Sequence, residues 1–483
     1  MGSVETLEPS VFVIFGGTGD LSRRKLLPAL ARHFEHGTLA GKCAVVGVSP
    51  DTSVNDESYR DLALKALSDA GLDKSAIDQL NENLYFQTIG KGTKDDYAAL
   101  ASRLNDIRKK HDLPQNYAFY LALPPGAVAG VVEGLDGAGL SKPEGWSRLV
   151  VEKPFGRDLA SAKALNDKLH QHFREEQIYR IDHYLGKETV QNLLVFRFAN
   201  AIFESLWNRE RVHSVEIRVA EDLGVGTRAG YYDKSGATRD MIQNHLTQLL
   251  TLVAMEVPTS FEADAIRHEK IKVLKSIAPI DCDRVVRGQY AGGTVDNRKV
   301  PGYREEAGVA DDSQTDTFVG LEILVNTWRW KGVPFYLRTG KRMKKRLTQI
   351  IVRFNDVPVS LFRSKGLALD TADILVLTLQ PDEGFSLHFD VKEPGEPFRL
   401  KRIPLAFRYK DEFHDMPEAY ETLLLDVLEG DQTLFVHAEE VEESWRVYTP
   451  LVENPPPLHS YPAGTWGPKE AEHLRVPEGD LWR

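Results

Sequence analysis

Residues 10–37 read SVFVIFGGTGDLSRRKLLPALARHFEHG. The segment opens with a short run of apolar, β-branched and aromatic side chains, which is typical of a buried strand. Gly16, Gly17 and Gly19 follow, and from Leu21 onward the apolar residues recur at helical spacing. Glycines allow a sharp turn and a close approach to a pyrophosphate, and the first turn of a helix attracts anions. Strand, glycine-rich turn and helix in this order therefore predict a dinucleotide-binding unit.

The glycine pattern is G-G-x-G-x-x-S, so Ser22 stands where the usual fingerprint has its last glycine. A plain tight turn would also explain the glycines, but the strand–turn–helix context favours a dinucleotide. Arg23, Arg24 and Lys25 add positive charge one turn into the helix. We expect Arg23 to lie on a solvated helix face.

The alternation of strands and helices continues to about residue 180. Because this alternation is typical of doubly wound folds, residues 1–180 are predicted to form an α/β Rossmann domain with a mostly parallel sheet. In the strand-like run ENLYFQ we expect Leu84 and Phe86 to share one face. The further predicted strands are 43–49, 82–87, 116–125 and 147–156, and the further predicted helices are 59–71 and 97–111.

The pattern changes beyond this point, where strand-like runs alternate polar and apolar residues as half-exposed antiparallel strands do. Residues 181–483 are therefore predicted to form an α+β domain with a large, mostly antiparallel sheet. The proline-rich segment 453–474 is expected to wrap the surface. The predicted strands are 212–221, 317–332, 333–340, 349–355, 373–381 and 384–392, and the predicted helices are 237–256 and 417–429.

Composition excludes several classes of protein. A chain of 483 residues is expected to form two or three domains, and its net charge of −11 argues against a nucleic-acid partner. The sequence has no apolar run of membrane-spanning length and no secretory signal pattern, so no membrane association is predicted. Cys43 and Cys282 are the only cysteines. They form no disulfide framework or zinc spacing, which favours a reducing cytoplasm and a site without metal.

Two further motifs carry polar groups to places where ligands bind. The motif VVEKPFG puts Glu152 and Lys153 at the carboxyl end of a parallel strand, and its proline suits a cis bond. The stretch IYRIDHYLGKE at 178–188 lies where the two domains should meet, which is a favoured place for a site. A solvated charge run would explain its composition but not the order of its residues.

Together these motifs resemble the glucose-6-phosphate dehydrogenase family over almost the whole chain. The resemblance implies oxidation of D-glucose 6-phosphate at C1 to 6-phosphogluconolactone with hydride transfer to NAD(P), which opens the oxidative pentose phosphate pathway. It also implies that the second domain binds substrate and forms a homodimer or homotetramer through its sheet. The motifs that carry it are GGTGDLSRRKLLP, LALPP, VVEKPFG, RIDHYLGKETVQN, RFAN, WNRERV, AGYYDKSGATRDMIQNHLTQLLTLVAME, GVPFYLRTGK and EAYETLLLDV, in that order.

The resemblance assigns the catalytic base to His245. Oxidation of a hemiacetal needs a base for the C1 hydroxyl proton, and histidine is the usual base near neutral pH. Without the resemblance, a core histidine on an amphipathic helix would be the simpler interpretation. Asp182, which alone would be a turn or cap residue, matches the carboxylate that orients the base. Asn244 is expected to support the site from behind.

The remaining site residues are also implied by the resemblance, and each lysine among them would otherwise be taken as solvated. A phosphate dianion needs cations and hydroxyls around it, and Gly186 lets the chain bend so that they converge. The matched substrate ligands are His183, Tyr184 and Lys187 for the phosphate, Glu221 and Asp240 for the sugar hydroxyls, and Lys153 and Lys341 as further contacts. The residues matched to the cofactor are Gly16, Gly17, Thr18, Gly19, Asp20, Leu21, Lys25, Ser49, Asp51, Pro124 and Lys153.

Two departures from the family pattern concern the cofactors. Family members commonly carry an Arg for the 2′-phosphate of NADP where this chain has Pro50, followed by Asp51. A proline cannot pair with a phosphate and a carboxylate would repel it, so we expect good use of NAD, with NADP also accepted. Alternatively, the 2′-phosphate is held by Ser49, Thr52 and Arg24.

Some family members bind a second, structural NADP in the C-terminal domain. Thr378 occupies a position that is Arg in those members, so we expect no structural NADP, although Arg239, Lys345 and Arg346 could hold an anion.

Two other functions stay open at this point. One is another NAD(P)-dependent sugar oxidoreductase, because EKP after a Rossmann strand also occurs in the glucose–fructose oxidoreductase group. The other is a non-catalytic dinucleotide sensor on a decayed scaffold. The phosphate ligands in RIDHYLGKE argue against the first, and the retained Asp182 and His245 argue against the second.

Overall fold

The computed structural model describes residues 7–359, 361–362, 372–413 and 416–475. By their internal contacts these residues fall into two compact units. Unit 1 combines the chain up to Lys187 with Ser260–Arg267 and Pro417–Glu442, and unit 2 holds the rest. The predicted domain boundary between residues 180 and 181 stays a prediction. Each unit is described separately below.

The described part of unit 1 is built on a six-stranded sheet in the order β3-β2-β1-β4-β5-β6. Every neighbouring pair is parallel, so the predicted doubly wound sheet is confirmed. Strand β1 lies inside the sheet and is buried along its whole length, as its apolar sequence requires. The strands are β1 (Ser10–Phe15), β2 (Cys43–Ser49), β3 (Leu84–Thr88), β4 (Tyr117–Leu121), β5 (Ser147–Glu152) and β6 (Ile178–Ile181).

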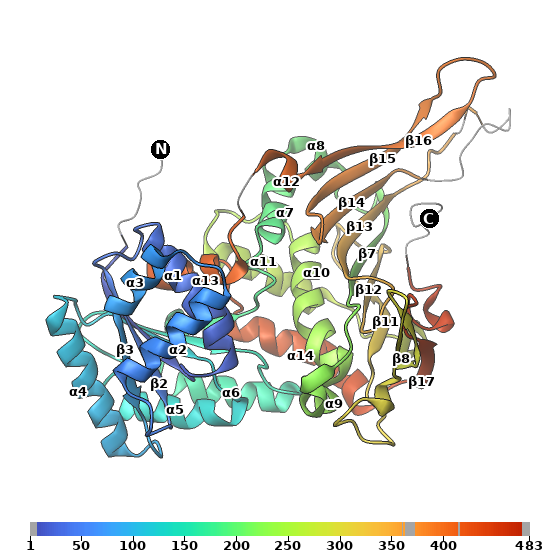
Figure 1. The fold of residues 1–483 in the computed structure, drawn as a ribbon. Helices are drawn as coiled ribbons and strands as arrows, with labels where there is room; N and C mark the ends of the chain where they lie inside the picture. Colours follow the sequence, from blue (N-terminus) through green and yellow to red (C-terminus); the bar gives the residue numbers. More distant parts are fainter. Residues whose placement is uncertain (1–6, 360, 363–371, 414–415, 476–483) are drawn as a thin grey trace. The chain divides into compact units, whose positions relative to one another are not determined.

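The helices of unit 1 include one from late in the chain. Leu423 and Leu424 of α13 share a buried cluster with Leu27 and Leu30 of α1, and Figure 1 shows the two helices side by side. Leu84 and Phe86 lie in this same cluster, so the expected shared face is confirmed. The helices are η1 (Ser22–Leu26), α1 (Leu27–Glu35), α2 (Asp56–Asp69), α3 (Lys74–Glu82), α4 (Lys94–Lys110), α5 (Pro125–Gly137), α6 (Leu159–His170), η2 (Glu175–Gln177) and α13 (Ala419–Glu429).

Unit 2 contains a sheet with nine strands among the described residues, in the order β16-β15-β14-β13-β7-β12-β11-β8-β17. The β7–β12 and β8–β17 pairs are parallel and the others antiparallel, which confirms a large, mostly antiparallel sheet. The strands are β7 (Val212–Ala220), β8 (Val285–Ala291), β11 (Phe318–Leu324), β12 (Pro334–Gly340), β13 (Leu347–Phe354), β14 (Ile374–Gln380), β15 (Gly384–Lys392), β16 (Leu400–Arg408) and β17 (Leu458–Pro462), and β9 (Gly293–Val295) and β10 (Arg298–Val300) form a small hairpin.

Helices of unit 2, among them α7 and α10, lie along one face of this sheet (Figure 1). Helices α11 (Ala263–Ser276) and α14 (Ala438–Glu453) each contain residues of both units. No helix among the described residues is long and apolar enough to cross a membrane. The helices within unit 2 are α7 (Glu188–Phe198), α8 (Ala201–Leu206), η3 (Gly226–Arg228), α9 (Ala229–Ala237), η4 (Thr238–Leu246), α10 (Thr247–Ala254), η5 (Cys282–Arg284), η6 (Tyr303–Glu305), α12 (Tyr409–Glu412) and η8 (Lys469–Ala471).

Two sequence predictions in unit 2 need correction. The single helix expected over 237–256 is a π-helix from Thr238 to Leu246 and an α-helix from Thr247 to Ala254. The tail expected to wrap the surface contributes β17, which pairs in parallel with β8. Strand β17 lies at the edge of the sheet, where a strand can contain prolines without breaking the pairing.

Candidate active site

The glycine-rich turn joins β1 to η1 in unit 1. Gly16 has φ +82°, and a Cβ there would lie 2.3 Å from the carbonyl oxygen of Ala122. A Cβ on Gly17 would lie 2.7 Å from the Cα of Gly47. The N–H of Gly19 donates to the Gly16 carbonyl at 2.8 Å and closes the turn. Only glycine fits these positions, and the resulting turn leads directly into a helix start, which is the arrangement that holds a pyrophosphate.

The predicted cofactor residues beside this turn are more exposed. Asp20 is exposed and its carboxylate lies 3.5 Å from the guanidinium of Arg24, while Arg23 is exposed as expected. The ammonium of Lys25 donates to Glu418 Oε2 at 2.7 Å. Glu418 stands at the N-cap of α13, so the segment Pro417–Glu442 supplies the partner of a lysine predicted to lie near the cofactor.

The loop after β2 contains the residues predicted to meet the adenosine ribose. Ser49 is buried, and its hydroxyl accepts a hydrogen bond from the Asp51 N–H at 3.1 Å. The Asp51 carboxylate accepts hydrogen bonds from the N–H and hydroxyl of Ser53 at 2.9 and 2.6 Å. These bonds lower the pKa of Asp51, so the exposed carboxylate is ionised at neutral pH. Pro124 follows β4 and is the exposed residue before α5.

The turn after β5 contains Glu152, Lys153 and a cis Lys153–Pro154 peptide. The hydroxyls of Tyr120 and Tyr420 donate to Glu152 Oε1 at 2.6 and 3.1 Å. Burial raises the pKa of Glu152, and the two tyrosine hydroxyls act in the opposite direction. The two tyrosines therefore hold the side chain of Glu152, the residue directly before Lys153. Lys153 itself is partly exposed.

The turn after β6 brings together the predicted residues of RIDHYLGKE that belong to unit 1. Asp182 is 2% exposed, and its Oδ1 accepts the N–H of Tyr184 at 3.0 Å. The His183 ring lies 5.0 Å from the Tyr184 ring, and the Lys187 ammonium lies 3.9 Å from the centre of that same ring. One short turn therefore presents a carboxylate, an imidazole, a phenol and an ammonium group.

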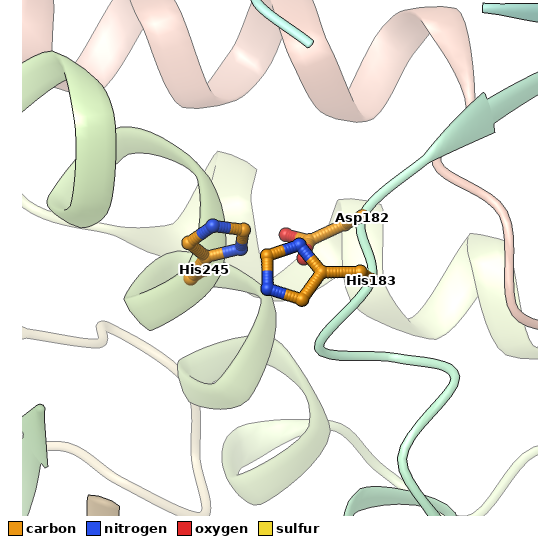
Figure 2. Close-up of side chains that lie close together, drawn as sticks. All are labelled: Asp182, His183 and His245. Atoms are coloured by element: carbon orange, nitrogen blue, oxygen red, sulfur yellow. The ribbon is translucent and has the colours of Figure 1, made fainter. Parts of the chain in front are cut away.

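Gly186 makes this turn possible. A Cβ at that position would lie 2.7 Å from both the Ala419 carbonyl oxygen and the Cγ of Leu423. The turn is thus packed tightly against α13 inside unit 1. Figure 2 shows the side chains of Asp182 and His183 leaving this turn, and the ring of His245 on a helical segment.

Two predicted ligands of unit 2 pair with each other. Strands β7 and β12 are parallel neighbours in which Ala220 lies opposite Gly340, so the next residues, Glu221 and Lys341, leave the same edge of the sheet. The Lys341 ammonium donates to Glu221 Oε2 at 2.6 Å. It also lies 4.9 Å from the centre of the Tyr232 ring. Residues 120 positions apart in the chain therefore form one polar pair.

The π-helix η4 carries Asp240, Asn244 and His245 in unit 2. Asp240 is 8% exposed and His245 is 1% exposed. In a π-helix, each N–H bonds to the carbonyl five residues earlier. Asp240 and His245 are five residues apart, so the π-helix places them nearer to the same helix face than an α-helix would. The Asn244 side chain accepts the His245 N–H at 2.6 Å and donates to the Arg239 carbonyl at 3.2 Å. Asn244 thus supports the helix backbone behind His245.

The start of η4 is fixed by Asp316, a residue that no pattern in the sequence singled out. Its Oδ2 accepts the N–H and the hydroxyl of Thr238, both at 2.9 Å. Gly236 has φ +68°, and a Cβ there would lie 2.8 Å from Asp316 Oδ1. Arg287 lies 3.3 Å from the same carboxylate.

Comparisons with known proteins match this chain from end to end. The family model for the glucose-6-phosphate dehydrogenase NAD binding domain matches residues 13–192, and the model for the C-terminal domain matches residues 194–483. The chain belongs to the glucose-6-phosphate dehydrogenase family. The glucose-6-phosphate 1-dehydrogenases of Aggregatibacter actinomycetemcomitans and of Bacillus subtilis (strain 168) are each 43% identical to it. The alignments cover 99% of this chain and 97% of the first protein, and 98% of both chains for the second.

A solved structure of a glucose-6-phosphate dehydrogenase in complex with its substrate glucose-6-phosphate has the same fold. Its TM-score is 0.89 at 34% sequence identity, and 97% of each chain is covered. The predicted fold class and family are therefore confirmed. The roles of the individual site residues stay predictions.

Two expectations about bound groups also stay predictions. The hydroxyl of Thr378, the residue from which we expect no structural NADP, accepts a hydrogen bond from Gln349 at 3.0 Å. Arg346 donates to Gln380 at 3.5 Å. The three residues labelled in Figure 2 are of types that also ligate divalent metals, whereas the sequence predicts a reaction without metal.

Proposed function

We propose that this protein is a glucose-6-phosphate 1-dehydrogenase. It oxidises D-glucose 6-phosphate at C1 to 6-phosphogluconolactone with NAD(P), the first step of the oxidative pentose phosphate pathway. The observation that carries the proposal is the turn after β6. This turn carries four polar side chains. The sequence around it aligns with glucose-6-phosphate 1-dehydrogenases over 99% of this chain.

The glycine turn of unit 1 fits a dinucleotide. A side chain on Gly16 or Gly17 would collide with backbone atoms, so the turn keeps the close backbone path that a pyrophosphate requires. Ser49 at the end of β2 and the residues after β4 and β5 lie at the same edge of the parallel sheet as this turn. Ser49, Pro124 and Lys153 are therefore suited to contact the ribose and nicotinamide ends of one extended cofactor.

His245 is the proposed base. It takes the proton of the C1 hydroxyl as the hydride leaves C1, and the C1–O bond becomes the carbonyl of the lactone. The bound nicotinamide supplies the acceptor for that hydride. The carboxylate of Asp182 orients the imidazole and stabilises its protonated form. Support for these roles comes from the burial of both side chains and from the short bond that fixes the backbone of His245.

His183, Tyr184 and Lys187 are the proposed phosphate ligands. An imidazole, a hydroxyl and an ammonium group on one turn are suited to a dianion, which needs several donors at once. Glu221 and Asp240 are proposed to accept hydrogen bonds from the sugar hydroxyls. Their partners in the sugar site are Lys341, which is already oriented by Glu221, and Lys153.

The enzyme is proposed to use NAD well and also to accept NADP. Asp51 is ionised and exposed, and its hydrogen bonds with Ser53 hold its loop in place. A carboxylate at the end of the second strand suits a free ribose 2′-hydroxyl and repels a 2′-phosphate. Arg24 lies on η1 and remains the candidate cation if NADP is also accepted.

We also propose a homodimer or homotetramer located in the cytoplasm. Strand β16 is an edge strand of the sheet, and its side chains Ile403 and Leu405 are 37% and 61% exposed. Exposed apolar side chains at the edge of a sheet are suited to be covered by a second copy of the chain. The two cysteines, Cys43 and Cys282, are both free thiols, as in proteins of a reducing compartment.

One assay tests the reaction. Purified protein is mixed with NAD or NADP and either glucose 6-phosphate or free glucose, and the reduced cofactor is followed by absorbance. We expect reduced cofactor with glucose 6-phosphate and a far slower rate with glucose. Equal rates with both sugars would favour a general sugar oxidoreductase, and no reduction with either sugar would favour a dinucleotide sensor.

A further inference from the structure

The backbone of Lys341 is held on both sides of its peptide unit. Its N–H donates to the Thr317 carbonyl at 2.9 Å, and its carbonyl accepts the hydroxyl of Tyr461 at 2.7 Å. The next residue, Arg342, has φ +51°, a left-handed conformation that non-glycine residues rarely adopt. The chain therefore turns sharply after Lys341, and surrounding contacts must hold that turn.

Tyr461 lies on β17, the strand formed by the C-terminal tail. Its side chain is fully buried, and its ring lies 5.8 Å from the ring of Phe318 at a steep angle. Gly288 leaves room for this ring, because a Cβ there would lie 3.0 Å from Tyr461 Cδ1. The tyrosine is thus locked in one position, and its hydroxyl has a fixed direction.

The hydroxyl of Tyr461 has two neighbours besides Lys341. The Thr317 hydroxyl lies at 3.0 Å and the Thr317 carbonyl at 3.2 Å. A phenol has one proton to donate, and the Lys341 carbonyl is the shortest acceptor. The Thr317 carbonyl already accepts the Lys341 N–H. Lys341 is the residue whose carbonyl depends on this hydroxyl.

The tail also holds the residues that follow Lys341. The N–H of Gly464 donates to the Arg342 carbonyl at 2.8 Å, and the N–H of Lys344 donates to the Thr465 carbonyl at 3.0 Å. The direction of the Lys341 side chain, and with it the 2.6 Å pair with Glu221, therefore depends on a tail strand about 120 residues away.

We propose that Tyr461 is a positioning residue for substrate binding, which acts by fixing the backbone of Lys341 through its hydroxyl. The inference rests on the proposed function, because it takes Lys341 to contact the sugar phosphate. It makes the tail strand β17 a part of the sugar-binding apparatus.

The test is Tyr461→Phe, which removes the hydroxyl and keeps the ring. Losing one neutral hydrogen bond should raise the KM for glucose 6-phosphate by about three- to ten-fold. The KM for the cofactor should not change. KM does not depend on how much of the enzyme is folded, so a purely structural loss would lower the apparent kcat and Tm and leave KM unchanged.

Tyr303→Phe is the matched control. Tyr303 is also fully buried in unit 2, and its hydroxyl donates to Asp233 at 2.9 Å. We expect this variant to lower Tm without changing the KM for glucose 6-phosphate.

The double variant Tyr461→Phe/Lys341→Ala tests whether the hydroxyl of Tyr461 changes the KM for glucose 6-phosphate by way of Lys341. If it does, removing the hydroxyl produces no further rise in KM once the lysine side chain is gone. An unchanged KM in the single variant, or additive effects in the double variant, would overturn the inference. A wild-type protein without activity on glucose 6-phosphate would instead refute the proposed function itself.

Discussion

Replacing Lys187 by Ala tests the phosphate site most directly. Its ammonium lies 3.9 Å from the centre of the Tyr184 ring, on the turn that also holds Asp182 and His183. A charge-assisted contact with the phosphate is worth about 1.5–3 kcal/mol, and each 1.4 kcal/mol is a factor of ten. Lys187 is partly exposed, so water competes for it and the lower half of that range applies. We expect kcat/KM for glucose 6-phosphate to fall by about ten- to forty-fold.

The decisive quantity is the ratio of kcat/KM for glucose 6-phosphate to that for free glucose. Glucose has no phosphate to lose a contact with, so the ratio should shrink by nearly the whole factor. The control is Lys168→Ala, which removes another partly exposed lysine of unit 1, one that pairs with Glu133. An equal loss for both sugars would show that Lys187 does not bind the phosphate.

Three further predictions concern other parts of the site. His245→Asn should keep the fold and lower kcat by about 10²–10⁴-fold with little change in KM for the sugar, and near-normal turnover would exclude His245 as the base. The ratio of kcat/KM for NAD and NADP should not favour NADP by more than about a hundred-fold, the most that one missing charge-assisted contact accounts for, and a larger preference would contradict the interpretation of Pro50 and Asp51. Gly186→Ala should lower the free energy of unfolding by about 1–3 kcal/mol, because the new Cβ would lie 2.7 Å from the Ala419 carbonyl; an unchanged Tm in thermal melts would refute the close packing.

Strands β1 and β2 of unit 1 were predictable because each is short, apolar and followed directly by a glycine or a proline. The predicted strands at 10–15 and 43–49 coincide with β1 and β2. The sequence could not show that Pro417–Glu442 packs with unit 1, since nothing in a helix that is amphipathic reveals which surface it covers. The pairing of Lys25 with Glu418 follows from that packing and was missed for the same reason.

The sequence also did not predict that His245 lies in a π-helix. Apolar residues at spacings of three and four fit an α-helix and a π-helix about equally well over nine residues. Distant segments also contact this helix, and Asp316 accepts hydrogen bonds from the N–H and the hydroxyl of Thr238 at its first residue. Strand β17 was hidden by its prolines, which suggest a loop unless the segment is known to lie at a sheet edge.

The two units place their site residues by the same physical rule. In unit 1, Ser49 ends strand β2, and the glycine turn, Lys153 and Asp182 directly follow strands of the same parallel sheet, whose carboxyl ends share one edge. The sheet of unit 2 is mostly antiparallel, so the carboxyl ends of most neighbouring strands point in opposite directions and their end residues do not meet. The parallel pair β7 and β12 is what brings Glu221 and Lys341 to 2.6 Å. The parallel pair β8 and β17 likewise carries Tyr461 into the sheet that supports Lys341. The two parallel pairs of this mostly antiparallel sheet therefore hold the proposed substrate ligand Lys341 in place, and a topology predicted from the sequence alone could not have shown this.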